Sequence, residues 1–70
     1  MIKVKQQEFK IAMAIKGFTG AELSRATGIS QSYIAQIISG KRSVLATTSS
    51  KICKALQSEF DDIFIIGGET

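Results

Sequence analysis

The sequence predicts an all-α fold of four to five helices, and two observations lead to it. Apolar residues recur at helical spacing along most of the chain, whereas no segment sustains the apolar–polar alternation of a half-buried strand. Glycines and hydroxyl side chains stand where such helices would begin and end. Because the chain contains no proline, its helix ends depend on glycine and on polar caps.

The first helix is expected over residues 5–16. Ala12 and Met13 follow Phe9 by three and four residues, so the three side chains share one helix face that can pack on a core. Gly17 follows at the position where a left-handed residue commonly ends a helix. These features predict an amphipathic helix with a defined C-terminal end.

The next two helices are expected over residues 20–27 and 31–39, joined by a very short turn. Thr19 and Glu22 have the spacing of a capping box at the start of the first of them. The turn, residues 28–30, reads Gly-Ile-Ser: a glycine suited to positive φ, an apolar plug and an N-cap serine. Two short helices joined in this way predict a helix-turn-helix motif.

Two further helical segments complete the expected domain. A fourth helix is expected over residues 48–57 and a short last helix over residues 60–64, each with apolar residues on one side. We find no internal repeat or linker. The sequence therefore predicts a single domain over residues 1–66, followed by a flexible tail over residues 67–70.

The chain lacks residue types that catalysis and metal binding commonly use. Its 70 residues are too few to enclose a deep, water-excluding cleft. It has no histidine, and its single cysteine, Cys53, can form neither an internal disulfide nor a Cys/His zinc site and is expected to be a small core residue. Asp61 and Asp62 are neighbours that point apart, which favours a capping role over a catalytic pair. We expect no enzymatic activity, no metal and no cofactor.

The composition also favours a soluble, cytoplasmic protein. No apolar run approaches the roughly 20 residues of a membrane span. Residues 1–5 lead into a polar stretch, not into the apolar core of a signal peptide. Small secreted domains usually need disulfides, which one cysteine cannot supply. We expect no contact with a membrane.

Charge is unevenly distributed along the chain. Residues 1–42 carry seven Lys and Arg against two Glu, a net +5, whereas residues 43–70 carry two Lys against four acidic residues, a net −2. The basic N-terminal part fits a polyanion such as nucleic acid. The same imbalance also occurs on ordinary solvated surfaces, so it does not by itself assign a function.

The third expected helix has two unlike faces. At 100° per residue, Ile34, Ile37 and Ile38 fall on one side, which must face the core. The other side carries short, polar and uncharged side chains: Ser32, Gln36 and Ser39, with Gln31 at the N-terminal tip and Ala35 and Tyr33 on the flanks. Such side chains suit the major groove of DNA. The alternative is a solvated face, which would more commonly carry Lys and Glu.

The run from Thr19 to Arg42 closely resembles the helix-turn-helix core of the lambda-repressor/Cro (XRE) family of phage and bacterial regulators. Residues 51–56 and 59–64 are similar to that family's fourth helix and closing turn, so the resemblance covers residues 5–66. It implies a compact lambda-repressor-like DNA-binding domain. Without a further domain, the chain would be similar to a small Cro-like protein of a phage lysogeny switch, acting in the cytoplasm of a bacterial host cell.

The resemblance also implies roles for individual residues. The base-reading positions would be Gln31, Ser32 and Gln36, with Tyr33 at a base or phosphate position. The phosphate contacts would come from the N-terminal amides of a helix that begins at Thr19 and Gly20, and from the loop residues Lys41, Arg42 and Ser43.

Two positions depart from the family pattern. Many relatives carry Gln at the position of Gly20, where the side chain braces the phosphate contact, so only the backbone amide remains here. Some relatives bury an Arg–Glu pair between the first and third helices, and those positions are Met13 and Ile38 in this chain. An apolar pair can replace a buried ion pair at little cost in stability.

Two hypotheses about function follow. The first is a sequence-specific DNA-binding transcriptional regulator of the Cro/repressor type, bound to double-stranded DNA as a homodimer. The alternative is a modulator, an antirepressor or co-repressor, that binds another regulator such as a larger phage repressor. The apolar residues Ile63, Phe64, Ile65 and Ile66 are either part of the core or a surface for such a partner.

Overall fold

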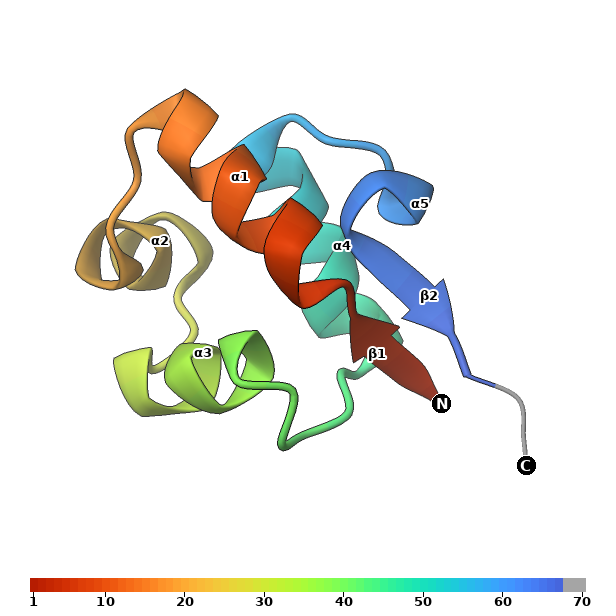
Figure 1. The fold of residues 1–70 in the computed structure, drawn as a ribbon. Coiled ribbons are helices and arrows are strands. Elements are labelled where there is room, and N and C mark those ends of the chain that lie inside the picture. Colours follow the sequence, from red (N-terminus) through yellow and green to blue (C-terminus); the bar gives the residue numbers. More distant parts are fainter. Residues whose placement is uncertain (68–70) are drawn as a thin grey trace.

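A computed structural model of the chain describes residues 1–67, within which five helices and one two-stranded sheet form (Figure 1). The helices are α1 (Gln6–Lys16), α2 (Gly20–Thr27), α3 (Gln31–Ile38), α4 (Ala46–Leu56) and α5 (Phe60–Ile63), and the strands are β1 (Ile2–Val4) and β2 (Phe64–Ile66). Figure 1 shows α1 in front of α4, with α2 and α3 to the left and α5 and the strands to the right. The mainly helical fold predicted from the sequence is confirmed.

The core lies where the helices meet. Its fully buried large side chains come from every helix and from β2: Phe9, Leu23, Ile34, Ile37, Ile52, Leu56, Ile63 and Phe64. The rings of Phe9 and Phe64 meet edge to face, with 6.0 Å between their centroids. Burying one such side chain contributes about 1.5–3 kcal/mol, so these contacts hold the short helices together.

The two strands were not predicted from the sequence. They pair antiparallel, with Ile2 opposite Ile66 and Val4 opposite Phe64, and the N–H of Val44 donates to the carbonyl of Ile2 at 2.8 Å on the other side of β1. Strands of three residues are too short to display alternation of apolar and polar residues. The sequence therefore carries no local signal for this sheet, although the sheet joins the two ends of the described chain.

The helices begin close to the expected positions, with one clear difference at α4. This helix begins at Ala46, two residues before the expected start at 48. Its N-cap, Leu45, makes no side-chain cap. Ser49, inside the first turns of this helix, is buried and donates its hydroxyl to the carbonyl of Ala46 at 2.8 Å. A serine inside a helix can bond to the preceding turn in this way.

The C-terminal apolar cluster divides between core and surface. Ile63 and Phe64 are each only 1% exposed, so the sequence-based suggestion that they belong to a partner surface is wrong for these two. Ile65 and Ile66, in contrast, are 52% and 69% exposed. Of the expected tail, Gly67 donates its N–H to the carbonyl of Met1 at 2.7 Å, and residues 68–70 lie outside the described residues.

The remaining singled-out residues have structural roles. Cys53 is half-buried against the core, and burial raises the pKa of its thiol, with the charges of Glu59 and Asp62 adding to the effect. A protonated thiol is unreactive. Asp62 caps α5, as expected, by accepting the N–H of Glu59 at 3.1 Å. Within residues 1–67, no helix has the length and hydrophobicity that crossing a bilayer requires.

We predict that Glu22 stabilises the fold at neutral pH and not in acid. Hydrogen bonds from the N–H and the hydroxyl of Thr19 lower the pKa of Glu22, helped by the nearby charge of Arg25. A pKa lowered by folding adds stability that is fully present above the ordinary pKa, 4.5, and is lost as the pH falls through the folded pKa. The urea midpoint, followed by circular dichroism, should therefore fall between about pH 7 and about pH 3.

The variant Glu22→Gln separates this effect from general acid denaturation. Its amide oxygen can still accept the N–H of Thr19, so the variant should lose less stability than the wild type over the same pH range. Glu8→Gln, at an exposed glutamate in the first turn of α1, is the matched control and should behave as the wild type. An equal loss in Glu22→Gln and the wild type would contradict the assignment.

Candidate nucleic-acid interface

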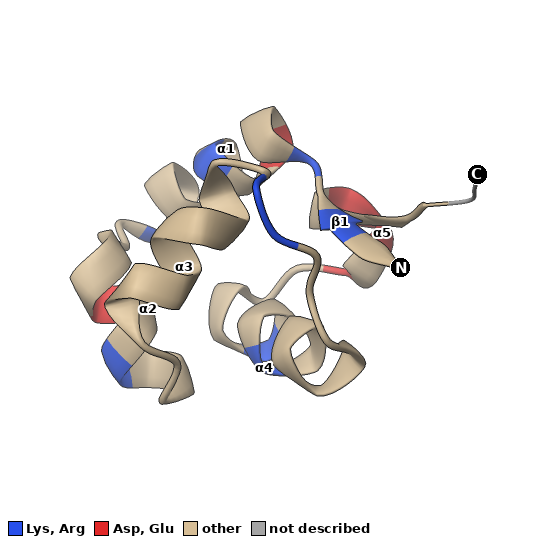
Figure 2. Ribbon diagram, turned by 90° about the horizontal axis from the view of Figure 1, so that it is seen from below, with Lys and Arg blue, Asp and Glu red and all other residues tan. Residues whose placement is uncertain are grey.

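The outward face of α3 is exposed and uncharged. Gln31, Ser32 and Gln36 are exposed, whereas Ile34 and Ile37 on the opposite face are buried in the core. Figure 2 views the molecule from the side of α3 and shows no charged residue along this helix, followed directly by a basic loop. This face can therefore donate and accept hydrogen bonds without bringing a charge of its own.

The turn between α2 and α3 has the form that the sequence predicted. Gly28 has a left-handed backbone with φ of 74°, and Ile29 is buried between the helices. Ser30 then caps α3, because its hydroxyl accepts the N–H of Tyr33 at 3.2 Å. These three residues fix the direction in which α3 leaves α2.

The end of α3 is also fixed. Gly40 donates its N–H to the carbonyl of Ile37 at 3.0 Å, and Lys41 donates its N–H to the carbonyl of Gln36 at 3.2 Å. This pair of bonds is a Schellman motif, which needs a left-handed residue at Gly40, where φ is 77°. The motif sets the start of the loop that carries Lys41, Arg42 and Ser43, all three exposed.

Gln6, at the start of α1, holds the same end of α3. Its Nε2 donates to the carbonyl of Ile38 at 3.1 Å, one of the carbonyls that a helix end leaves unpaired. Sequence analysis missed this residue, because no local pattern marks a contact between residues that are 32 positions apart. The Gln6 side chain thus links the C-terminal end of α3 to α1.

Three predicted contact residues form one cluster on this surface. The Nη1 of Arg42 donates to the Oε1 of Gln36 at 2.8 Å, and the guanidinium lies over the ring of Tyr33, 5.2 Å from its centroid. Tyr33 is half-buried and packs against the core. The sequence assigned a base-reading residue and a phosphate residue separately, and the structure brings them into direct contact.

The capping box that the sequence predicts at the start of α2 is present, and it occupies amides that a phosphate could otherwise contact. The N–H of Thr19 donates to Glu22 Oε1 at 2.9 Å, and the N–H of Glu22 donates to the hydroxyl of Thr19 at 3.2 Å. Within residues 1–67, the N–H groups of Gly20 and Ala21 are left without a protein acceptor in this first turn. A phosphate here would meet two amides, with the Glu22 carboxylate close by.

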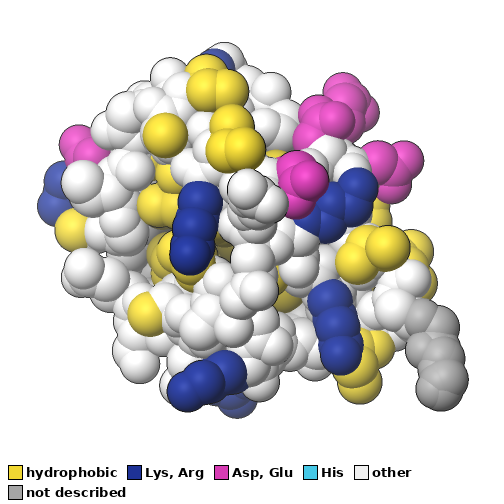
Figure 3. All heavy atoms as spheres, in the orientation of Figure 1, with side chains coloured by type: hydrophobic (Ala, Val, Ile, Leu, Met, Phe, Trp, Pro, Cys, Tyr) yellow, Lys and Arg dark blue, Asp and Glu magenta, His cyan; other side chains and the backbone are white. Residues whose placement is uncertain are grey.

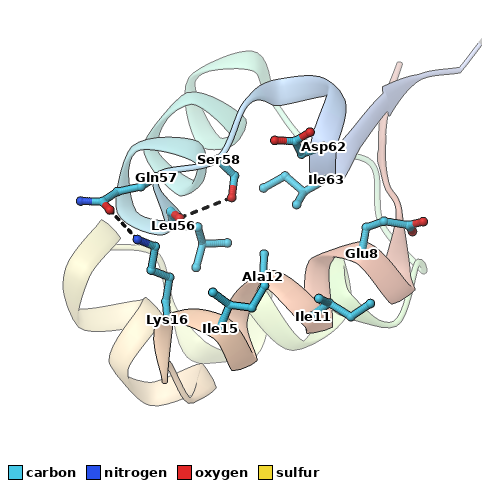
Figure 4. A pocket seen from close by; sticks show the side chains of 10 residues that line it. All are labelled: Glu8, Ile11, Ala12, Ile15, Lys16, Leu56, Gln57, Ser58, Asp62 and Ile63. Atoms are coloured by element: carbon cyan, nitrogen blue, oxygen red, sulfur yellow. Dashed lines mark hydrogen bonds between the residues drawn. The ribbon is translucent and has the colours of Figure 1, made fainter.

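A separate hollow of about 450 Å³ lies between α1, the end of α4 and α5 (Figure 4). Ala12, Leu56 and Ile63 line it, with Ile11 and Ile15 on its α1 side. Figure 3 shows hydrophobic side chains uncovered over α1. No group of three or more His, Cys, Asp or Glu within the described residues 1–67 could hold a metal ion. The hollow thus combines an apolar floor with polar and charged residues on its lining, Glu8, Lys16, Gln57, Ser58 and Asp62.

Comparison with known proteins gives two findings. The family model described as helix-turn-helix matches residues 10–63. A crystal structure of a candidate DNA-binding protein from Bacteroides fragilis is similar, with a TM-score of 0.75, 20% sequence identity and coverage of 93% of this chain and 100% of that chain. At this identity the similarity shows a common fold. None of the curated proteins matches the chain.

We predict that Gly40→Ala destabilises the fold by about 1–2 kcal/mol, the cost of placing a side chain on left-handed backbone. The new Cβ would also lie 3.0 Å from Nε2 of Gln6 and disturb the bond to Ile38. Gly20→Ala is the matched control, because nothing lies within 4 Å of a Cβ there. It should be neutral or stabilising by up to about 1 kcal/mol.

Urea unfolding of both variants measures the difference. Gly40→Ala should have the lower midpoint of the two variants and of the wild type. Equal stability of the two variants would show that the end of α3 is not held as described.

Proposed function

The chain belongs to the helix-turn-helix family, and on that basis we propose that it is a sequence-specific DNA-binding transcriptional regulator of the Cro/repressor type. Membership in this family assigns the chain to regulators and not to enzymes. The observation that carries the proposal is the outward face of α3, which combines exposed, uncharged hydrogen-bonding side chains with a basic loop at its end. The fold shared with a candidate DNA-binding protein supports it.

In this proposal α3 lies in the major groove, which is wide enough to admit a helix. Gln31 and Ser32 at its N-terminal end and Gln36 one turn later face the edges of the bases. A glutamine amide can pair with two groups of one base edge, and a serine hydroxyl can either donate or accept. These side chains supply sequence preference.

Phosphate contacts would supply most of the affinity. The candidates are Lys41, Arg42 and Ser43 in the loop after α3, with the amides of Gly20 and Ala21 at the start of α2. Lys3 on β1, the strand coloured blue in Figure 2, is a further exposed cation. Because this surface carries few Lys and Arg side chains, one copy of the domain would bind DNA weakly. Tight binding would need two copies that contact two half-sites of the same duplex.

A homodimer on DNA would meet that need. The exposed side chains of Ile65 and Ile66 on β2 are apolar and form the proposed contact between copies. When two copies are joined, binding of the first places the second at a high effective concentration near its half-site. The affinity for a paired site therefore rises although each copy makes the same contacts. The domain would then recognise a site made of two related halves.

The closed capping box favours a second candidate function. With the N–H of Thr19 held by Glu22, a phosphate at α2 would find two amides beside a carboxylate, which weakens anion binding. A chain that binds DNA poorly by itself could act as a modulator, an antirepressor or co-repressor, of a larger repressor. A mobility shift with the chain alone and with such a repressor added distinguishes the two functions.

We predict that Gln31→Ala and Lys41→Ala impair DNA binding in different ways. The probe is a pool of duplexes with a randomised central segment. Gln31→Ala should cost about 1–3 kcal/mol at one base position and relax the preference there. Lys41→Ala should weaken binding to all sequences and reduce the salt slope by about one.

Lys51→Ala, at an exposed lysine on α4, is the control and should retain both the base preference and the salt slope. The sequence-specific function is excluded if the wild type enriches no duplex sequence at low salt. Enrichment that appears only when a larger repressor is added would instead support the modulator.

We predict that Ile66→Asp prevents pairing of two copies, because a charge in the apolar contact would lose its hydration. Light scattering of the protein with duplexes that carry two half-sites or one half-site measures the stoichiometry. Ile15→Asp is the matched control, since Ile15 is 76% exposed and lies on α1, away from β2. A complex of two wild-type copies that survives Ile66→Asp unchanged would remove this surface from the proposal.

A further inference from the structure

The cluster of Tyr33, Gln36 and Arg42 fixes the orientation of one amide in the proposed base-reading surface. The Oε1 of Gln36 accepts from Nη1 of Arg42 at 2.8 Å. Arg42 is in turn held by Tyr33, whose ring lies 5.2 Å below the guanidinium carbon and is itself packed against the core. Arg42 therefore takes up one of the two lone pairs of the Gln36 amide oxygen, whereas both N–H groups of Nε2 are left to contact other groups.

This orientation changes what Gln36 can recognise. A free glutamine pairs with adenine through both amide atoms, because its oxygen accepts from N6 and its nitrogen donates to N7. With Arg42 beside the oxygen and one of its lone pairs taken, the pair offers mostly donors: the N–H groups of Gln36 Nε2 and the remaining N–H groups of the guanidinium. Guanine presents two adjacent acceptors, O6 and N7, in the major groove, whereas adenine presents a donor beside its acceptor.

We propose that Arg42 is a specificity-determining residue, which holds Gln36 as a hydrogen-bond donor and so directs it to guanine in preference to adenine. This inference rests on the proposed function. It gives Arg42 a role that a simple phosphate contact lacks, because a phosphate contact weakens binding to every sequence alike. The two roles therefore differ in their effect on base preference.

The exposed side chain of Arg42 can be removed without opening the core, which makes Arg42→Ala the informative variant. Selection from a pool of duplexes with a randomised central segment is carried out with the full chain. Gln36→Ala first identifies the base position that Gln36 reads, because preference is lost there. At that position the wild type should select guanine, and Arg42→Ala should change the preference towards adenine by about tenfold.

Lys41→Ala is the matched control, since Lys41 adjoins Arg42 in the same loop and has no side-chain bond to α3 within residues 1–67. It should leave the preferred base unchanged. In the double variant with Gln36→Ala and Arg42→Ala, no adenine preference should arise, because the amide that would read adenine is absent. These results together would support the role of Arg42.

A readout without DNA tests the contact itself. In the NMR spectrum of the free protein, Arg42→Ala should shift the side-chain amide signals of Gln36 and leave those of Gln31 in place. Unchanged Gln36 signals would overturn the inference. So would a wild type that selects adenine at the Gln36 position, or an Arg42→Ala variant that weakens all duplexes equally. If the wild type enriches no duplex at all, the proposed function itself fails.

Discussion

The burial of Ile34 and Ile37 is the constraint on which the presented surface depends. Because both side chains are fully enclosed by the other helices, α3 cannot rotate about its own axis without exposing them to water. A helix with a fixed rotation has a fixed outer face. Gln31, Ser32 and Gln36 are therefore exposed because of core packing. Their own side chains need no further contact to keep them on the surface.

Both ends of α3 are held as firmly as its inner face. The Ser30 hydroxyl accepts the N–H of Tyr33 at the N-terminal end, and the left-handed backbone at Gly40 closes the other end and sets the start of the basic loop. Gln6 links that end to α1. The helix is thus a short rigid element with polar side chains on rigid backbone, which is the condition for selective recognition of a surface.

Whether a feature could be predicted from the sequence depends on how far apart its interacting residues lie along the chain. The turn at Gly28, Ile29 and Ser30 was predictable because its residues act on their immediate neighbours. The pairing of β1 with β2 and the bond from Gln6 to Ile38 join distant parts of the chain, so no local pattern reveals them. The contact between Arg42 and Gln36 depends on side-chain conformations that helical periodicity does not specify. In the apolar run over residues 63–66, the sequence shows that all four side chains are apolar. It does not show that Ile63 and Phe64 are the two that face the core.

The sheet has a consequence for how the domain is made during translation. A ribosome synthesises β1 first and β2 only after all five helices, so β1 has no partner strand while the helices emerge. Pairing between such distant segments carries a large loop-closure entropy that preformed helices reduce. Phe64, which covers Phe9 in the core, also arrives with β2. A nascent chain stalled before Phe64 would therefore carry α3 on a core that still lacks the ring packed against Phe9.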